Sequence, residues 1–297
     1  MAGIPQKILV ATDFSSTADS AEKLAFQLAR LLGAELHLVH VRVILEDPLM
    51  AEEQQLEMER LMSSADDATQ AAFARGRPGE PGISVETHLV RSISAAEAIV
   101  EIASEIDCDL IVMGTHGRRG IKHMLLGSVA ENVVRSVDIP VLTLRPGIEL
   151  PANGPKRILL AHDFSDQSAI AIRTARDWAE AFDAEITLLH VVEPVVYPEF
   201  YAINALSDDV MTRLRDRATE ALDDAAEEAL GDLPVNTVVL IGRAADTIIN
   251  EAQPENFDLL IMGTRGLTGL EQLVLGSVAE AVLRRCPVPL LTVSGEE

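Results

Sequence analysis

The chain has 297 residues, of which 48% are hydrophobic, and a formal net charge of −23. This length predicts two domains, and the negative charge disfavours nucleic acid and anionic membranes as partners. Apolar runs of strand length, the lack of a signal-peptide core and only two cysteines predict a cytoplasmic protein without membrane spans or disulfides.

Short apolar runs alternate with helical patterns along the first half. The pattern predicts strands near 7–12, 35–41, 84–90, 109–114 and 141–145, and helices near 16–32, 50–75, 94–106 and 128–137. Ser15 or Ser16 should cap the first helix, and Gly33 should end it. The strand runs lack polar alternation, as in parallel strands covered on both faces. We therefore expect an α/β fold with a five-stranded, parallel, doubly wound sheet that binds ligands at the carboxyl ends of its strands.

The second half repeats the first. Residues 7–15 return as 157–165, and residues 38–41 return as 188–191. Strands are accordingly predicted near 157–162, 185–191, 235–241, 258–263 and 290–294. A segment rich in proline and glycine lies between the copies. We expect one domain over 1–146, a linker over 147–155 and a second domain over 156–297.

A glycine motif occurs once in each half with identical spacing. Gly114 and Gly117 are followed after nine residues by Gly127 and Ser128, and the second copy contains Gly263, Gly266, Gly276 and Ser277. An apolar run precedes each copy and a Ser-Val-Ala-Glu helix start follows it. Glycine lets the backbone approach an anion, through its small size and its conformational freedom, and the first helical N–H groups point at that anion. The motif therefore predicts a phosphate-binding loop in each half.

These residues resemble the universal stress protein family, in its tandem two-domain form and its ATP-binding branch. The resemblance implies two Rossmann-like domains of the adenine nucleotide alpha hydrolase type, each binding ATP with Mg²⁺ carried by the phosphates. In the first half it implies contacts with ATP from Ala11, Thr12, Asp13, Val41, Met113, Gly114, Gly117, Arg118, Gly127, Ser128 and Val129. In the second half the corresponding residues are Ala161, His162, Asp163, Val191, Met262, Gly263, Arg265, Gly266, Gly276, Ser277 and Val278.

The two halves differ at two positions near the expected adenosine pockets. Thr12 in the first half corresponds to His162 in the second, and the loop after the third strand contains Gly242 only in the second half. The first glycine loop also contains three cations and no acid, whereas Arg265 in the second loop is offset by Glu271. We therefore expect the two sites to bind ATP unequally.

Several candidate residues also have structural interpretations. The aspartates Asp13 and Asp163 suit Asx turns. Ser128 and Ser277 each precede a glutamate by three residues, which predicts a capping box. His40 and His190 suit hydrogen-bonded core positions. The seven histidines and two cysteines show no zinc-ligand spacing, so no protein metal ligands are predicted.

The glycine motif lacks the Gly-Lys-Ser/Thr sequence of a Walker A loop, and no catalytic triad can be assigned. These features favour a nucleotide-dependent sensor or adaptor in a stress response, with an unknown protein partner. Two alternatives stay open: a slow ATPase or phosphotransferase, and a protein-interaction module with a structural nucleotide. The halves should pair antiparallel through their fifth strands, which makes a pseudo-dimer within one chain and leaves a further homodimer open.

Overall fold

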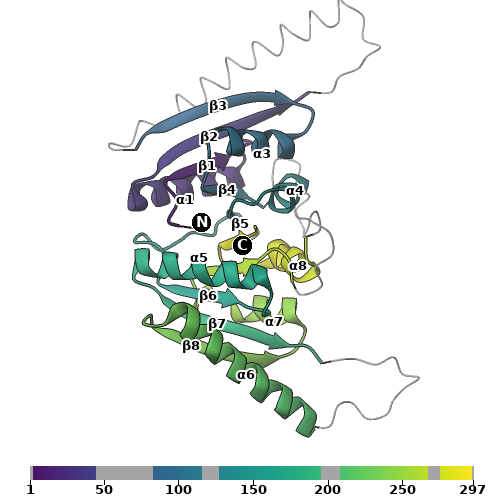
Figure 1. The fold of residues 1–297 in the computed structure, drawn as a ribbon. Coiled ribbons are helices and arrows are strands. Elements are labelled where there is room, and N and C mark those ends of the chain that lie inside the picture. Colours follow the sequence, from purple (N-terminus) through teal and green to yellow (C-terminus); the bar gives the residue numbers. More distant parts are fainter. Residues whose placement is uncertain (1–2, 45–82, 116–126, 195–207, 267–274, 296–297) are drawn as a thin grey trace, which may run out of the picture.

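A computed structural model describes residues 3–44, 83–115, 127–194, 208–266 and 275–295 (Figure 1). The first half contains β1 (Lys7–Ala11), α1 (Ser16–Leu32), β2 (Glu35–Val43), β3 (Val85–Ser92), α3 (Ala95–Glu105), β4 (Leu110–Gly114), α4 (Ser128–Ser136) and β5 (Val141–Leu144). The second half contains β6 (Arg157–Ala161), α5 (Asp166–Phe182), β7 (Glu185–Val192), α6 (Asp208–Leu230), β8 (Val235–Ile241), α7 (Ala244–Glu251), β9 (Leu259–Gly263), α8 (Ser277–Arg285) and β10 (Leu290–Val293). All ten predicted strands are confirmed, with ends shifted by at most two residues. The helix predicted near 50–75 lies outside the described residues.

All ten strands form one sheet, in the order β3-β2-β1-β4-β5-β10-β9-β6-β7-β8. Strands within each half are parallel, whereas β5 and β10 are antiparallel at the centre. This pairing confirms the prediction that the halves join through their fifth strands. Two buried threonines support the join, because Thr143 Oγ1 donates to Leu290 O at 3.3 Å and Thr292 Oγ1 donates to Val141 O at 3.2 Å.

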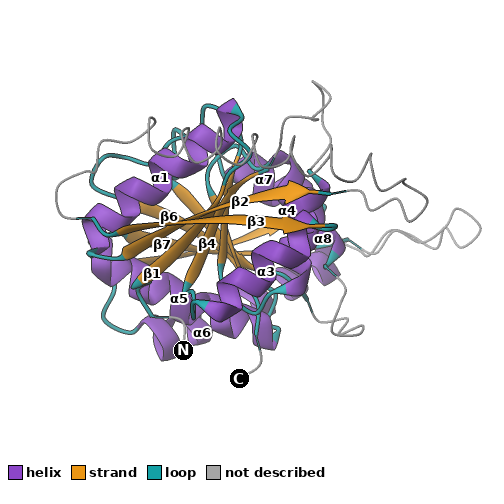
Figure 2. Ribbon diagram, turned by 90° about the horizontal axis from the view of Figure 1, so that it is seen from above, coloured by secondary structure: helices purple, strands orange, loops and turns teal. Residues whose placement is uncertain are grey.

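Helices cover both faces of the sheet (Figure 2). On one face α1, α5 and α6 bury side chains such as Leu28, Ile172 and Leu222 against the strands. On the other face α3, α4, α7 and α8 bury side chains such as Val133 and Val282. The central strands β1, β4, β6 and β9 are buried on both faces and consist of nearly continuous apolar runs, whereas the edge strand β3 is largely polar and exposed. The predicted doubly wound α/β architecture is therefore confirmed in both halves.

The first helix of each half begins after a serine cap and ends at a residue with left-handed backbone angles, as predicted for α1. Ser15 is the N-cap of α1, and its Oγ accepts a hydrogen bond from Ala18 N at 3.2 Å. Gly33 ends the helix with a left-handed φ of 71°. In the second half Ser165 is the N-cap of α5, and Asp183 takes the left-handed position with a φ of 50°. Of the two serines predicted as the N-cap of α1, Ser15 is the one that caps the helix.

The two cysteines are free and buried on opposite halves of the chain. Burial raises the pKa of both the Cys108 and the Cys286 thiol to about 12, which makes both sulfurs poor nucleophiles. Within the described part of the chain, none of the helices has the length and apolar character needed to cross a bilayer.

Candidate functional site

A cleft of about 250 Å³ opens in the second half, where β6 and β9 end and α8 begins. The chain runs outward from β6 to β7 and β8, then returns to β9 on the other side of β6. Such a reversal leaves a crevice at the carboxyl ends of the strands. All eleven second-half residues named from the sequence line this cleft: Ala161, His162, Asp163, Val191, Met262, Gly263, Arg265, Gly266, Gly276, Ser277 and Val278.

Backbone hydrogen bonds close the stem of the glycine loop in the same way in both halves. In the second half Thr264 N donates to Val293 O, and Gly276 N donates to Thr264 O, both at 2.9 Å. In the first half Thr115 N donates to Leu144 O at 3.0 Å, and Gly127 N donates to Thr115 O at 2.7 Å. The loop interiors, 116–126 and 267–274, lie outside the described residues, and Gly117 and Arg118 fall among them.

The capping-box prediction is wrong, because the glycine before each serine, and not the serine itself, is the N-cap. Gly276 is the N-cap of α8, no side chain caps it, and Ser277 is the first helical residue. Glu280 N donates to Gly276 O, and the carboxylate of Glu280 accepts from Arg284 instead of reaching back to the cap. In the first half Gly127 precedes Ser128 in the same way. Each first turn therefore lacks a side-chain cap, which suits a helix end that receives an anion.

The described glycines of the motif do not adopt left-handed backbone angles, and those of the second copy have close neighbours. Gly276 has ordinary values of φ −61° and ψ 143°. A Cβ at Gly276 would lie 3.2 Å from Thr264 O, and one at Gly266 would lie 2.5 Å from Asp163 Oδ2. The expected conformational freedom is thus not what Gly276 supplies, and close approach is the physical reason for glycine there.

The structural interpretation of the aspartates is confirmed. Asp163 Oδ1 accepts from Ser165 N at 3.1 Å and from the hydroxyls of Ser165 and Ser168. Asp13 Oδ1 accepts from Ser15 N at 3.0 Å in the corresponding turn. Asp163 lines the cleft as well, so the turn holds a carboxylate at the carboxyl end of β6.

His40 in β2 and His190 in β7 are half-buried and hydrogen-bonded, and the hydrogen bonding agrees with the prediction. His190 Nδ1 lies 2.8 Å from His162 O, and His40 Nδ1 lies 2.7 Å from Thr12 O. The sequence did not indicate what packs on them. Phe14 and Phe164 have left-handed φ values of 59° and 63°, and their rings lie against these histidines. Positive φ at a bulky residue is strained and often marks a functional turn.

His162 brings a neutral imidazole to the cleft. Burial lowers its pKa to about 4, with the charge of Asp163 opposing this shift and His190 adding to it. His162 Nδ1 is buried and has no hydrogen-bond partner in the described part of the molecule. This nitrogen can therefore form a hydrogen bond with a ligand group in the cleft.

Comparison with known proteins gives the family. Residues 5–145 and 154–294 each match the model of the Universal stress protein family. The chain belongs to this family. A universal stress protein of Mycobacterium tuberculosis is 29% identical over 214 residues, covering 70% of this chain and 68% of that protein. One from Thermus aquaticus is 35% identical over 139 residues, covering 46% of this chain and 98% of that protein.

The fold agrees with a solved member of the family. The crystal structure of a universal stress protein from Archaeoglobus fulgidus aligns with a TM-score of 0.63 at 20% sequence identity, covering 97% of this chain and 98% of that chain. The alignment spans both universal stress protein domains, so the two-domain fold is shared along the chain.

The first universal stress protein domain places its described candidates at the equivalent edge. Ala11, Thr12, Asp13, Val41, Met113, Gly114, Gly127, Ser128 and Val129 lie at the carboxyl ends of β1, β2 and β4 and the start of α4. Thr12 stands where the second domain has His162, and its Oγ1 accepts from Phe14 N at 3.1 Å. Ala18 stands where the second domain has Ser168. The first domain therefore lacks two polar groups that border the second cleft.

Proposed function

We propose that this universal stress protein binds ATP in each domain, with Mg²⁺ carried by the phosphates, and acts as a nucleotide-dependent sensor or adaptor in a stress response. The observation that carries the proposal is the cleft of the second domain. This cleft is lined by the uncapped start of α8, by Gly266 and Gly276, which have close neighbours, and by the carboxylate of Asp163.

The cleft offers different surfaces for the different parts of the nucleotide. Apolar side chains of Leu189, Val191 and Ile248 suit a purine ring. The backbone N–H groups at the start of α8 suit the phosphates, because anions bind favourably at helix N-termini. Asp163 is the carboxylate among the described lining residues, and it suits a ribose hydroxyl or a water of the phosphate-bound Mg²⁺.

The same residues disfavour fast catalysis. Rapid phosphoryl transfer uses cations on the transferred phosphate and a residue that positions the nucleophile. Among the described residues that line the cleft, Arg265 is the one with a cationic side chain. Asp163 is held by two serine hydroxyls, and His162 is neutral and buried. These features support nucleotide binding with hydrolysis that is slow at most.

Mass spectrometry of the nucleotide released from the purified protein, followed by calorimetry with ATP and Mg²⁺, tests the proposal. Saturable ATP binding that Gly127→Val and Gly276→Val together remove supports it. Absence of ATP binding in the folded wild-type chain overturns it. Single-turnover hydrolysis then separates the sensor from an ATPase, and partner capture with and without ATP separates it from a module whose nucleotide is structural.

A further inference from the structure

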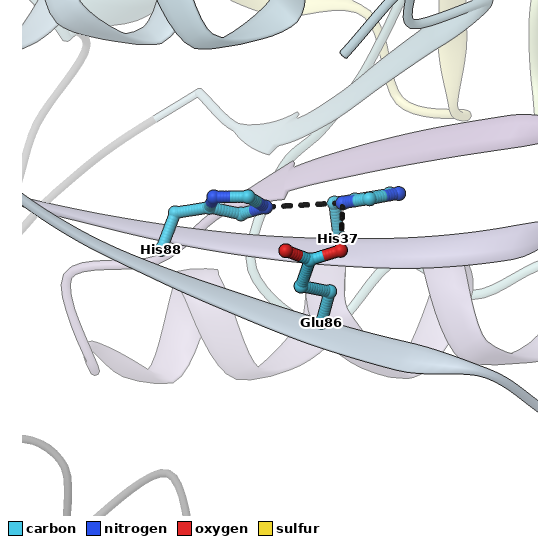
Figure 3. A group of neighbouring side chains, drawn as sticks. All are labelled: His37, Glu86 and His88. Atoms are coloured by element: carbon cyan, nitrogen blue, oxygen red, sulfur yellow. Dashed lines mark hydrogen bonds and ion pairs between the residues drawn. The ribbon is translucent and has the colours of Figure 1, made fainter.

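Three side chains meet in the amino-terminal halves of β2 and β3, in the first domain (Figure 3). His37 Nδ1 lies 3.0 Å from His88 Nε2 and 3.7 Å from the nearer carboxylate oxygen of Glu86. One nitrogen or oxygen atom from each residue lies within 4.8 Å of the other two. His37 is 51 positions from His88 in the sequence, so only the strand register brings them together.

We propose that His37, Glu86 and His88 bind one divalent transition-metal ion of the Zn²⁺ type. The ligand atoms are His37 Nδ1, His88 Nε2 and one carboxylate oxygen of Glu86. Two imidazoles and a carboxylate suit zinc and similar ions, which bind nitrogen and oxygen at about 2.0–2.2 Å.

The distances are close to those that a metal requires. Two nitrogens bound tetrahedrally at about 2.0–2.1 Å lie about 3.3–3.4 Å apart. The two ring nitrogens are 3.0 Å apart, so a shift of a few tenths of an ångström would admit the ion. Glu86 has a side chain that is 68% exposed and can reorient, whereas His37 is buried and fixed in place. His37 can therefore hold the metal in a defined position, while the exposed Glu86 leaves the site open to metal entering from solvent.

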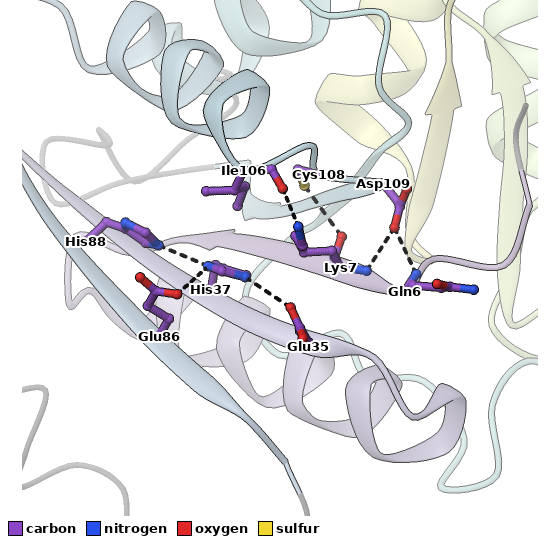
Figure 4. Close-up of polar contacts among 9 residues, drawn as sticks. All are labelled: Gln6, Lys7, Glu35, His37, Glu86, His88, Ile106, Cys108 and Asp109. Atoms are coloured by element: carbon purple, nitrogen blue, oxygen red, sulfur yellow. Dashed lines mark hydrogen bonds and ion pairs between the residues drawn. The ribbon is translucent and has the colours of Figure 1, made fainter.

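Groups around the three ligands support binding of a cation (Figure 4). A carboxylate oxygen of Glu35 lies 3.9 Å from His37 Nε2, the ring nitrogen that does not face the site. At that distance Glu35 makes no hydrogen bond to the ring, and its negative charge favours a cation at the site only through space. Lys7 opposes binding through its charge, but its ammonium donates to Ile106 O at 2.5 Å. The carboxylates of Glu35 and Glu86 together outweigh the positive charge of Lys7 near the site, which favours binding of a cation.

The second domain lacks this cluster although its backbone is the same there. The strand register places Thr187 at the position of His37, Asn236 at that of Glu86 and Val238 at that of His88. The three ligand types are therefore not required to form these strands. The second domain also shows which replacements the fold accepts, and so provides variants for the test.

Chelator-treated protein without nucleotide is titrated with Zn²⁺ by calorimetry and with Co²⁺ by absorption spectroscopy. The wild-type chain should bind one ion, with the intense visible absorption of a four- or five-coordinate Co²⁺ site. His88→Val, which takes the residue of the second domain, should weaken Zn²⁺ binding at least about 100-fold, because losing even an outer partner of a ligand costs about 10–100-fold. Glu35→Gln, which removes one exposed negative charge near the site, should weaken it by less than about fivefold.

His40→Gln is the matched control, because it removes a histidine from the same strand without touching the cluster, and it should retain the metal. Wild-type affinity in the folded triple variant His37→Thr, Glu86→Asn, His88→Val would overturn the proposal. A measurement on the wild type alone is independent of variant folding. The ring proton signals of His37 and His88 should shift together as Zn²⁺ saturates the protein, and unchanged signals would also overturn the proposal.

Discussion

The two domains differ in side chains while sharing the backbone that builds the site. Both close the glycine loop with the same pair of hydrogen bonds, begin the next helix at an uncapped glycine, and hold a phenylalanine at positive φ. The second domain adds His162 and Ser168 beside its aspartate, where the first has Thr12 and Ala18. In the proposed function, the shared backbone would hold the phosphates in both domains, and the side chains would adjust each site separately.

The largest expected effect comes from filling the space at the start of α8. Gly276→Val would add a Cβ 3.2 Å from Thr264 O, with two methyl groups attached to it. We expect ATP affinity of the second site to fall at least about 100-fold, since the phosphate position and the helix N–H groups become blocked. Calorimetry measures the affinity, and circular dichroism checks the fold. Full affinity in a folded variant would show that the phosphates lie elsewhere.

Gly114 and Gly263 test whether helix packing explains the first glycine of the motif. A Cβ at Gly114 would lie 2.6 Å from Thr17 Cγ2, whereas one at Gly263 would lie 2.9 Å from Gln167 Cβ. Gly114→Ala and Gly263→Ala should each lower the free energy of unfolding by about 1–3 kcal/mol, as overpacking does.

A second substitution in the neighbouring helix should restore the lost stability in the first domain but not in the second. Thr17→Ser removes Cγ2 and should restore most of the stability of Gly114→Ala. Gln167→Ala keeps its Cβ and should not restore Gly263→Ala. Urea unfolding of the single and double variants measures this difference. Equal rescue in both domains, or in neither, would contradict the packing explanation.

His162 should make the second domain sensitive to acid. Its pKa in the folded chain is about 4, below the ordinary 6.5. Between these values the unfolded chain binds a proton that the folded chain does not, so the free energy of unfolding falls as the pH is lowered from 6.5 toward 4. At pH 5 this loss should be about 1–2 kcal/mol.

His162→Thr, which takes the residue of the first domain, should remove that part of the pH dependence. Urea unfolding of both proteins at pH 7.5 and pH 5 gives the difference between their pH responses, which cancels any packing change. Parallel responses would show that His162 is not the buried neutral group described above.

A smaller effect is expected from the serine that holds Asp163. Ser168 Oγ donates to Asp163 Oδ1 and accepts from Asp163 N at 3.0 Å. Ser168→Ala, which takes the residue of the first domain, should cost about 0.5–1.5 kcal/mol of stability. It should also weaken ATP binding by the second site only a few-fold, and calorimetry in the Gly127→Val background isolates that site. A loss as large as that of Gly276→Val would mean that Ser168 contacts the nucleotide.

The sequence predicted those features that depend on local pattern. Apolar runs located the ten strands, and Ser15 and Gly33 located the ends of α1, because caps and strands follow from neighbouring residues. The capping box failed at Ser277 because Gly276 takes the N-cap position, where its N–H donates to Thr264 O. The meeting of His37 with His88 depends on the register between β2 and β3, which sequence spacing does not contain.

The most direct test of the account is calorimetric titration of ATP with Mg²⁺ into four proteins: wild type, Gly127→Val, Gly276→Val and the double variant. The account predicts two ATP sites in the wild type, one in each single variant and none in the double variant. It also predicts tighter binding in Gly276→Val than in Gly127→Val at low salt, because the sequence of the first loop contains three cations and no acid. This gap should shrink as salt rises, since salt screens attraction between charges. Undiminished binding by a folded double variant would contradict the claim that the two glycine loops hold the nucleotide.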